Sequence, residues 1–173
     1  MEIYRCAKPR RARDLSGFGA SLSGGRWNSR GRSVIYAAGS PALAILEKLV
    51  HLNLARLPSD MRLITIEVPD KASLTRVREK DLPKGWSDSP GPDRLREIGD
   101  KWLSKGSTLL LRVPSAVSPH DLNYLINPNH PDISQVRVAR VEPARVYARL
   151  AKRGKGRTKA QTVHLPESRN RVS

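Results

Sequence analysis

The sequence places a glutamate and a histidine one helical turn apart in a strongly apolar segment, as Glu47 and His51. Ser40 and Pro41 predict the start of that helix, because a serine caps free backbone amides and a proline fits the first turn. We expect the helix to run from residue 41 to about residue 54, buried on nearly all sides. A carboxylate there has a high desolvation cost unless it is paired or faces a cleft. Glu47 is therefore either part of a reactive site or one partner of an ordinary pair with His51 or an arginine.

A second group of residues combines backbone freedom with a cation, in the run Gly24-Gly25-Arg26-Trp27-Asn28. Glycines let the backbone approach a ligand, and the forked Arg26 guanidinium suits a pyrophosphate. The run lacks the lysine and Ser/Thr of a P-loop and the strand-turn-helix setting of a Rossmann motif. It predicts either a phosphate-binding loop or a tight turn with a solvated arginine.

Three more polar residues are candidates through their positions alone. Tyr36 ends an expected strand shortly before the helix just described, where its ring is suited to stack on a flat heterocycle or to pack in the core. Ser115 follows an expected strand and Asn127 lies in a proline-rich turn, and both residue types are common as caps and turn formers. His120 and His130 stand apart without the ligand spacing of a zinc hydrolase, so we expect no metal site.

The composition bounds the class of protein. The chain has 173 residues, enough for one domain with a hydrophobic core, and a formal net charge of +16 that attracts polyanions, anionic ligands or acidic protein surfaces. Nucleic-acid binding is therefore one candidate function. Cys6 is the single cysteine, so no intrachain disulfide forms and a reducing compartment is expected. The sequence shows no signal peptide and no apolar run of membrane length, which predicts a cytoplasmic protein without a membrane contact.

The hydrophobic patterning predicts an α+β fold in a single domain. We expect the folded domain to span residues 1–151. Residues 152–173 are expected to form a basic, disordered tail, because they contain many lysines and arginines and few apolar residues. A structured glycine-rich loop is expected at 16–31. The expected strands are 2–6, 33–38, 62–68, 107–113, 135–142 and 144–150, and the expected helices are 41–54 and 94–105.

Taken together, these segments resemble the RES domain, which is named for its Arg, Glu and Ser residues. The resemblance extends from about Ile3 to Leu150, and the ordered combination of motifs is far more specific than any one of them. It rests on Tyr4-Arg5, Ser16-Gly17-Phe18-Gly19-Ala20, Gly24-Gly25-Arg26-Trp27-Asn28-Ser29-Arg30-Gly31, Val34-Ile35-Tyr36, Ser40-Pro41-Ala42-Leu43-Ala44-Ile45-Leu46-Glu47 and on to His51, Val113-Pro114-Ser115-Ala116-Val117 and Asn123-Tyr124-Leu125-Ile126-Asn127-Pro128-Asn129-His130-Pro131.

The resemblance implies a fold with mixed sheets, similar to the ADP-ribosyltransferases, and an activity on NAD as a substrate, with no separate cofactor. By the same resemblance, the catalytic residues are Arg26, Tyr36 and Glu47. The residues that it implies for the substrate site are Arg5, Gly25, Trp27, His51, Ser115 and Asn127.

Three functions stand as alternatives. The first is a toxin of a toxin-antitoxin pair that cleaves NAD at the nicotinamide-ribose bond, with Glu47 stabilising the oxocarbenium-like ribose. The second is a mono-ADP-ribosyltransferase that modifies a specific protein, and the third is a basic nucleic-acid-binding protein. The resemblance also implies an Xre-like antitoxin as the partner. It allows a homodimer, and the positive charge of the chain allows a nucleic-acid contact through the basic tail or through the antitoxin.

Overall fold

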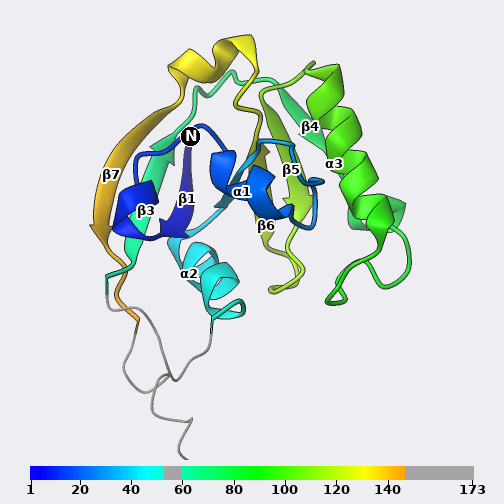
Figure 1. Ribbon diagram of the computed structural model, residues 1–173, viewed down its shortest axis with the longest axis horizontal. Coiled ribbons are helices and arrows are strands. Elements are labelled where there is room, and N and C mark those ends of the chain that lie inside the picture. The colour runs from blue at the N-terminus through cyan, green and yellow to red at the C-terminus, as the bar shows by residue number, and fades with distance from the viewer. Residues whose placement is uncertain (53–59, 147–173) are drawn as a thin grey trace, which may run out of the picture.

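The computed structural model describes residues 1–52 and 60–146 of the chain. Figure 1 shows a strongly curved sheet with short helices on its surface. The strands are β1 (Glu2–Ala7), β2 (Ile35–Ala38), β3 (Arg62–Glu67), β4 (Leu74–Arg76), β5 (Leu110–Pro114), β6 (Leu122–Ile126) and β7 (Arg137–Pro143). The α-helices are α1 (Phe18–Ser23), α2 (Pro41–Leu49) and α3 (Asp93–Lys105), and short 3₁₀ helices lie at Pro9–Arg11, Glu79–Asp81 and Pro131–Gln135.

The seven strands form one mixed sheet in the order β4-β5-β6-β2-β1-β3-β7. Neighbouring strands are antiparallel, except that β4 and β5 are parallel. β1 and β3 pair along their whole length, whereas β1 and β2 pair at one register position, Tyr4 with Ala38. The sheet therefore consists of two halves, β7-β3-β1 and β2-β6-β5-β4, which are joined by this narrow contact.

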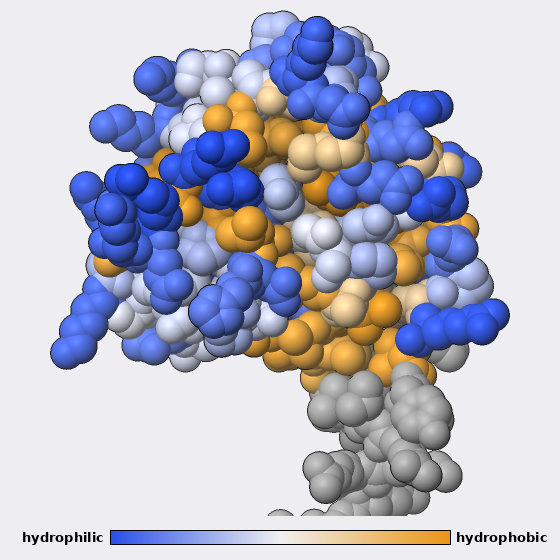
Figure 2. All heavy atoms as spheres, turned by 180° about the vertical axis from the view of Figure 1, so that it is seen from behind, coloured by the Kyte–Doolittle hydropathy of each residue, from blue (hydrophilic) through white to orange (hydrophobic). Residues whose placement is uncertain are grey.

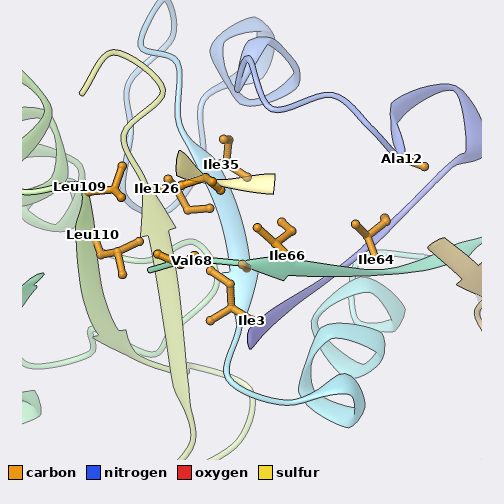
Figure 3. Close-up of a cluster of buried hydrophobic side chains, with 11 residues drawn as sticks. Ile3, Ala12, Ile35, Ile64, Ile66, Val68, Leu109, Leu110 and Ile126 are labelled. Carbon is orange, nitrogen blue, oxygen red and sulfur yellow. The ribbon is translucent and has the colours of Figure 1, made fainter. Parts of the chain in front are cut away.

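One face of the sheet, which we call the inner face, carries the main hydrophobic core. Ile3 and Ile64 from the first half meet Ile35, Leu110 and Ile126 from the second half in a single cluster (Figure 3). Each of these five side chains is at most 1% exposed. Alternate residues of a strand point to the same face, so these positions form a continuous apolar surface. Burial of that surface holds the two halves together.

The opposite face, which we call the outer face, carries α2 over β1, β2 and β3. The predicted start of this helix is confirmed, because Ser40 Oγ accepts a hydrogen bond from the Leu43 amide at 3.2 Å. Leu43 and Ala44 are buried against Ala38 of β2. α2 is thus fixed at its N-terminus and along one face.

Two expectations for α2 are wrong. The helix ends at Leu49 and not near residue 54, because the following amides of His51 and Leu52 form tighter bonds to carbonyls three residues back. The helix is also not buried on nearly all sides, since Leu46 and Val50 are 39% and 52% exposed. The apolar residues outnumber those that the sheet can cover, and the surplus faces outward.

α3 covers the other half of the outer face and supports the glycine-rich loop. Leu95 and Trp102 of the helix pack in one cluster with Trp27 of the loop and Leu125 of β6. The backbone of α3 at Gly99 lies directly against the backbone of Trp27, because a Cβ atom added to Gly99 would lie 1.8 Å from the Trp27 carbonyl oxygen. The position of Trp27, and of the residues beside it, therefore depends on α3.

The expected α+β class is confirmed, and the strands expected at 2–6 and 62–68 occur as β1 and β3. β2, β5 and β7 are shorter than or shifted from the strands expected near them. Residues 16–31 contain α1, and neither β4 nor β6 was expected, because β4 has three residues and the alternation in β6 is weak. Residues 144–146 form no strand. The rest of the strand expected at 144–150, the domain boundary at 151 and the basic tail lie outside the described residues.

The surface combines hydrophilic and apolar areas. Seen from behind, hydrophilic side chains surround an apolar area that extends to the lower edge of the domain (Figure 2). Phe18 and Leu22 of α1 are further exposed apolar side chains. Among residues 1–52 and 60–146, no helix combines the length and the apolar content needed to cross a bilayer.

Candidate active site

The Glu47 carboxylate lies where α2 meets the second half of the sheet. Its Oε1 atom accepts hydrogen bonds from Ser115 Oγ at 2.9 Å and from Asn123 Nδ2 at 2.5 Å. Such bonds offset the cost of removing a carboxylate from water. Within the described part of the chain, Glu47 pairs with neither His51 nor an arginine, and Oε2 receives no hydrogen bond. Oε2 is therefore the oxygen that a ligand would approach.

Ser115 is fixed in the orientation that serves Glu47. Its Oγ atom accepts hydrogen bonds from the Val117 and Ser118 amides, both at 3.1 Å, and its own amide donates to the Asp121 carbonyl at 2.9 Å. The side chain is 4% exposed. Because backbone amides occupy the acceptor side of the hydroxyl, its hydrogen points to the carboxylate.

Tyr36 lies on the same outer face as this carboxylate site. Ala38 of β2 pairs with Asn123 of β6, and Tyr36 pairs with Leu125, so all four side chains leave the sheet on one side. Tyr36 and Asn123 are diagonal neighbours on adjacent strands, a position in which Cα atoms lie about 7–8 Å apart. The sheet register therefore brings the tyrosine close to the residue that binds Glu47.

The Tyr36 hydroxyl makes two hydrogen bonds to the glycine-rich loop. It donates to Asn28 Oδ1 at 2.7 Å and accepts from the Trp27 amide at 3.0 Å. Burial raises the pKa of Tyr36 well above its ordinary value, so the phenol remains protonated and continues to donate. A Cβ atom on Gly25 would lie 2.6 Å from this hydroxyl, which explains why the loop carries a glycine there.

The Tyr36 hydroxyl contributes to stability as well as to any chemistry. In Tyr36→Phe, the fully buried Asn28 Oδ1 and the Trp27 amide lose their partner, so we expect the free energy of unfolding to fall by about 1–3 kcal/mol. Urea denaturation measures the change. Tyr124→Phe is the matched control, because that hydroxyl has no hydrogen-bond partner among the described residues. Equal stability of the two variants would contradict a structural role for the Tyr36 bonds.

Arg26 extends from the same loop to the segment that precedes α3. Its guanidinium donates from Nη1 to the Trp86 carbonyl and from Nη2 to the Asp88 carbonyl, the latter at 3.0 Å. Trp86 and Ser115 both line a cavity of about 780 Å³. Arg26 is thus not a solvated turn residue. It fixes a wall of a cavity whose lining includes the serine bonded to Glu47.

Other residues expected at the substrate site lie elsewhere. The Trp27 side chain is buried in the core beneath α3, and only its amide contacts Tyr36. His51 is exposed and lies beyond the end of α2. Asn127 follows the far end of β6, four residues or about 13 Å from Asn123. Its Oδ1 accepts from the Asn129 amide at 3.0 Å, so it shapes a turn.

Arg5 projects from the inner face, opposite the Glu47 site, because its neighbour Tyr4 pairs with Ala38 of the outer face. Its guanidinium donates to the carbonyls of Asp14 at 2.9 Å and Arg11 at 2.7 Å. Burial lowers the pKa of Arg5. In the structure Arg5 therefore anchors the segment that follows β1, and its expected role in substrate binding stays a prediction.

Loss of the Arg5 contacts should lower the stability of the fold. We expect Arg5→Met to lower the free energy of unfolding by at least about 2 kcal/mol, because it removes charge-assisted bonds to two carbonyls. Thermal and urea denaturation measure this loss. A variant as stable as the wild type would contradict the anchoring role of Arg5.

The sequence did not indicate Asn123 or Trp86 as site residues. Asn123 is one amide in a segment that was not recognised as a strand, so its orientation toward Glu47 had no signal. Trp86 contributes a carbonyl, which no side-chain pattern reports. Within the described residues, no three His, Cys, Asp or Glu side chains gather as potential metal ligands.

Comparison with protein families decides the relationship. A model of the RES domain matches residues 2–148, which include Arg26, Tyr36, Glu47, Ser115 and Asn123. The chain belongs to the RES family. The resemblance noted from the sequence motifs is thereby confirmed.

Similar proteins include three toxins from different bacteria. "Prs ADP-ribosylating toxin" of Sphingobium sp. (strain YBL2) is 44% identical over 137 residues, which cover 78% of this chain and 85% of that protein. "Toxin Res" of Pseudomonas putida is 44% identical over 127 residues, covering 72% of this chain and 85% of that protein. "Toxin Res" of Yersinia enterocolitica is 38% identical over 144 residues, covering 83% and 93%.

The RES fold of this chain is also found in a solved structure. A chain in the crystal structure of the M. tuberculosis MbcT–MbcA toxin-antitoxin complex superposes with a TM-score of 0.68, covering 88% of this chain and 87% of that chain. The two sequences are 19% identical, so the likeness is one of fold. It confirms the α+β fold that the family resemblance implied.

Proposed function

We propose that this RES protein is the toxin of a toxin-antitoxin pair and that it cleaves NAD at the bond between nicotinamide and ribose. The observation that carries the proposal is the Glu47 carboxylate, which Ser115 and Asn123 hold on the same sheet face as Tyr36. The similarity to proteins named as Res toxins and as an ADP-ribosylating toxin supports the same chemistry.

The proposed reaction consumes NAD and water and yields ADP-ribose, nicotinamide and a proton. The bond from ribose C1′ to nicotinamide breaks, its electron pair leaves with nicotinamide, and water forms the new bond at C1′. The ribose passes through an oxocarbenium-like state, which a nearby anion stabilises electrostatically. Glu47 supplies that anion through the oxygen that no described residue occupies.

The other site residues have positioning roles in this proposal. Ser115 and Asn123 fix the carboxylate, and Tyr36 and Gly25 shape the floor of the site beside it. Arg26 fixes the Trp86 segment, and its remaining donors are suited to the pyrophosphate. Trp27, His51 and Asn127 receive no direct contact with the substrate.

Incubation of the purified protein with NAD tests the proposal. NAD labelled in its ADP-ribose half should give free labelled ADP-ribose and an equal amount of nicotinamide, separated by chromatography. No nicotinamide release, from protein shown to be folded by circular dichroism, would reject the reaction.

The second candidate is transfer of ADP-ribose to a protein, and the 44% identity to a toxin named for ADP-ribosylation favours it specifically. The same Glu47 site serves both reactions, because only the acceptor at C1′ differs. Labelled NAD and cell lysate distinguish them: hydrolysis leaves the label in free ADP-ribose, and transfer leaves it on a macromolecule.

An antitoxin is the expected partner, as the fold shared with a toxin-antitoxin complex suggests, and an Xre-like protein remains the class that we propose. Phe18 and Leu22 of α1 and Leu46 and Val50 around α2 are exposed apolar side chains of the kind that a protein partner covers. A second copy of the chain is the alternative occupant. Co-purification with the product of the adjacent reading frame tests the first, and the oligomeric state of the purified chain tests the second.

Nucleic-acid binding is kept as a lesser alternative, because a net charge of +16 attracts polyanions. Under this proposal the domain comprises residues 1–151, and the basic segment 152–173 makes any nucleic-acid contact. Truncation after residue 151 should then remove salt-sensitive RNA and DNA binding and leave NAD turnover intact.

A further inference from the structure

The cavity beside Ser115 has a charge arrangement that the Glu47 site does not explain. Its volume of about 780 Å³ is in the range of ligand pockets. Its lining includes three arginines, Arg76, Arg78 and Arg112. Trp86 and the loop that contains Ser115 complete the wall. Arginine is well suited to oxyanions, because its planar fork donates two parallel hydrogen bonds.

Arg76 and Arg112 stand side by side on parallel strands. They are register partners of β4 and β5, two residues beyond Leu74 and Leu110, so both side chains leave the inner face of the sheet, opposite the face that carries Glu47. Within residues 1–52 and 60–146, neither guanidinium has a hydrogen-bond acceptor or an ion-pair partner. Like charges in adjacent positions of neighbouring strands repel. A bound anion would relieve this repulsion.

The other charges of the cavity leave this pair free. Arg78 forms an ion pair with Asp81, in which Nε donates a hydrogen bond to Oδ2 at 2.7 Å. Two carboxylates also line the cavity: Glu79, and Asp121, which accepts from Ser118 Oγ at 2.6 Å. Neither forms an ion pair with Arg76 or Arg112 in the described structure.

We propose that Arg76 and Arg112 bind a phosphate group of a small molecule in this cavity. The assignment rests on the proposed function for its link to catalysis: Ser115 lines the cavity and is bonded to Glu47, and Arg26 is bonded to the Trp86 wall. The phosphate belongs either to a separate phosphorylated small molecule or to NAD. In the second case the ribose would lie at Glu47 on the outer face, and the rest of NAD would pass around the end of β5 beside Ser115 to the arginines on the inner face.

Calorimetric titration with ADP tests the site on the full chain. Wild-type protein should bind ADP saturably and more weakly at higher salt, and Arg76→Gln and Arg112→Gln should each raise the Kd by about 10-fold or more. Arg94→Gln is the matched control, because it removes an exposed arginine of α3 and should leave the Kd unchanged. Absence of saturable binding, or equal Kd values for the three variants and wild type, would overturn the proposal.

Steady-state kinetics then distinguish the two sources of the phosphate. If it belongs to NAD, ADP competes with NAD, and Arg112→Gln raises the KM for NAD with little change in kcat. If it belongs to a separate ligand, the KM for NAD is unchanged and ADP inhibits without competition or not at all. Because ADP binding needs no turnover, a chain that binds ADP through this pair but releases no nicotinamide overturns only the proposed function. If the protein cleaves NAD but Arg76→Gln and Arg112→Gln leave its Kd for ADP unchanged, only this inference is overturned.

Discussion

Replacing Glu47 by glutamine should reduce the rate of nicotinamide release from NAD by at least about 100-fold. The amide has the shape of the carboxylate and still offers an oxygen to Ser115 and Asn123, so the fold should be retained. The substitution removes the negative charge that stabilises the developing positive charge on ribose. Loss of a single group that stabilises transition-state charge typically lowers the rate by about 100-fold or more. The measurement is kcat/KM from NAD consumption by purified wild-type and variant protein.

The control for this substitution removes a carboxylate from the surface. Glu97→Gln affects an exposed residue of α3 that pairs with Arg94, and it should leave nicotinamide release unchanged. Near-wild-type turnover by a folded Glu47→Gln protein would exclude the carboxylate from the reaction. Unchanged growth of cells that express the variant, compared with arrest by the wild type, would support the toxin function separately.

The second large effect concerns stability and lies at Gly99, far from Glu47 in sequence. A methyl group at this position would overlap the Trp27 carbonyl oxygen at 1.8 Å, so α3 or the glycine-rich loop must move. We expect Gly99→Ala to lower the free energy of unfolding by about 3 kcal/mol or more, measured by urea denaturation. Nicotinamide release should fall with it, because Trp27 holds the Tyr36 hydroxyl and adjoins Arg26.

Gly19→Ala is the matched control for this prediction. Gly19 is also helical, in α1, but an added Cβ there would meet no atom closer than 4.0 Å. Alanine is a better helix former than glycine, so this variant should be as stable as wild type or more stable, by up to about 1 kcal/mol. If both variants unfold at the same urea concentration, the close packing of α3 on Trp27 is incorrect.

Local sequence signals predicted the elements that carry their own boundaries. Ser40-Pro41 fixed the start of α2, and the alternation in 62–68 predicted β3. The end of α2 was less predictable, because residues 50–52 are compatible with a helix and the change to tighter turns depends on tertiary packing. β4 and β6 obtain their stability from neighbouring strands, so short segments with weak alternation gave little signal.

The candidate site was predictable where family motifs named the residue and not where the partners lie far apart in sequence. Glu47 and Ser115 were expected, and they are hydrogen-bonded. Asn123 lies 76 residues from Glu47 and was missed, since its role comes from the β2-β6 register. Arg5 is the opposite case: its residue type suits a ligand, and the alternation of β1, which the sequence analysis did not use, places it on the inner face.

The narrow contact between β1 and β2 has a consequence for how the carboxylate is aligned. Glu47 is carried by a helix packed on β1, β2 and β3, whereas Ser115 directly follows β5 and Asn123 belongs to β6. Their hydrogen bonds therefore cross the junction between the two halves of the sheet. A small rotation of one half against the other would change the distances from Glu47 to Ser115 and Asn123. The isoleucines of the inner core are remote from any substrate. By fixing the orientation of the two halves, they also keep the donors of Ser115 and Asn123 aligned with the Glu47 carboxylate.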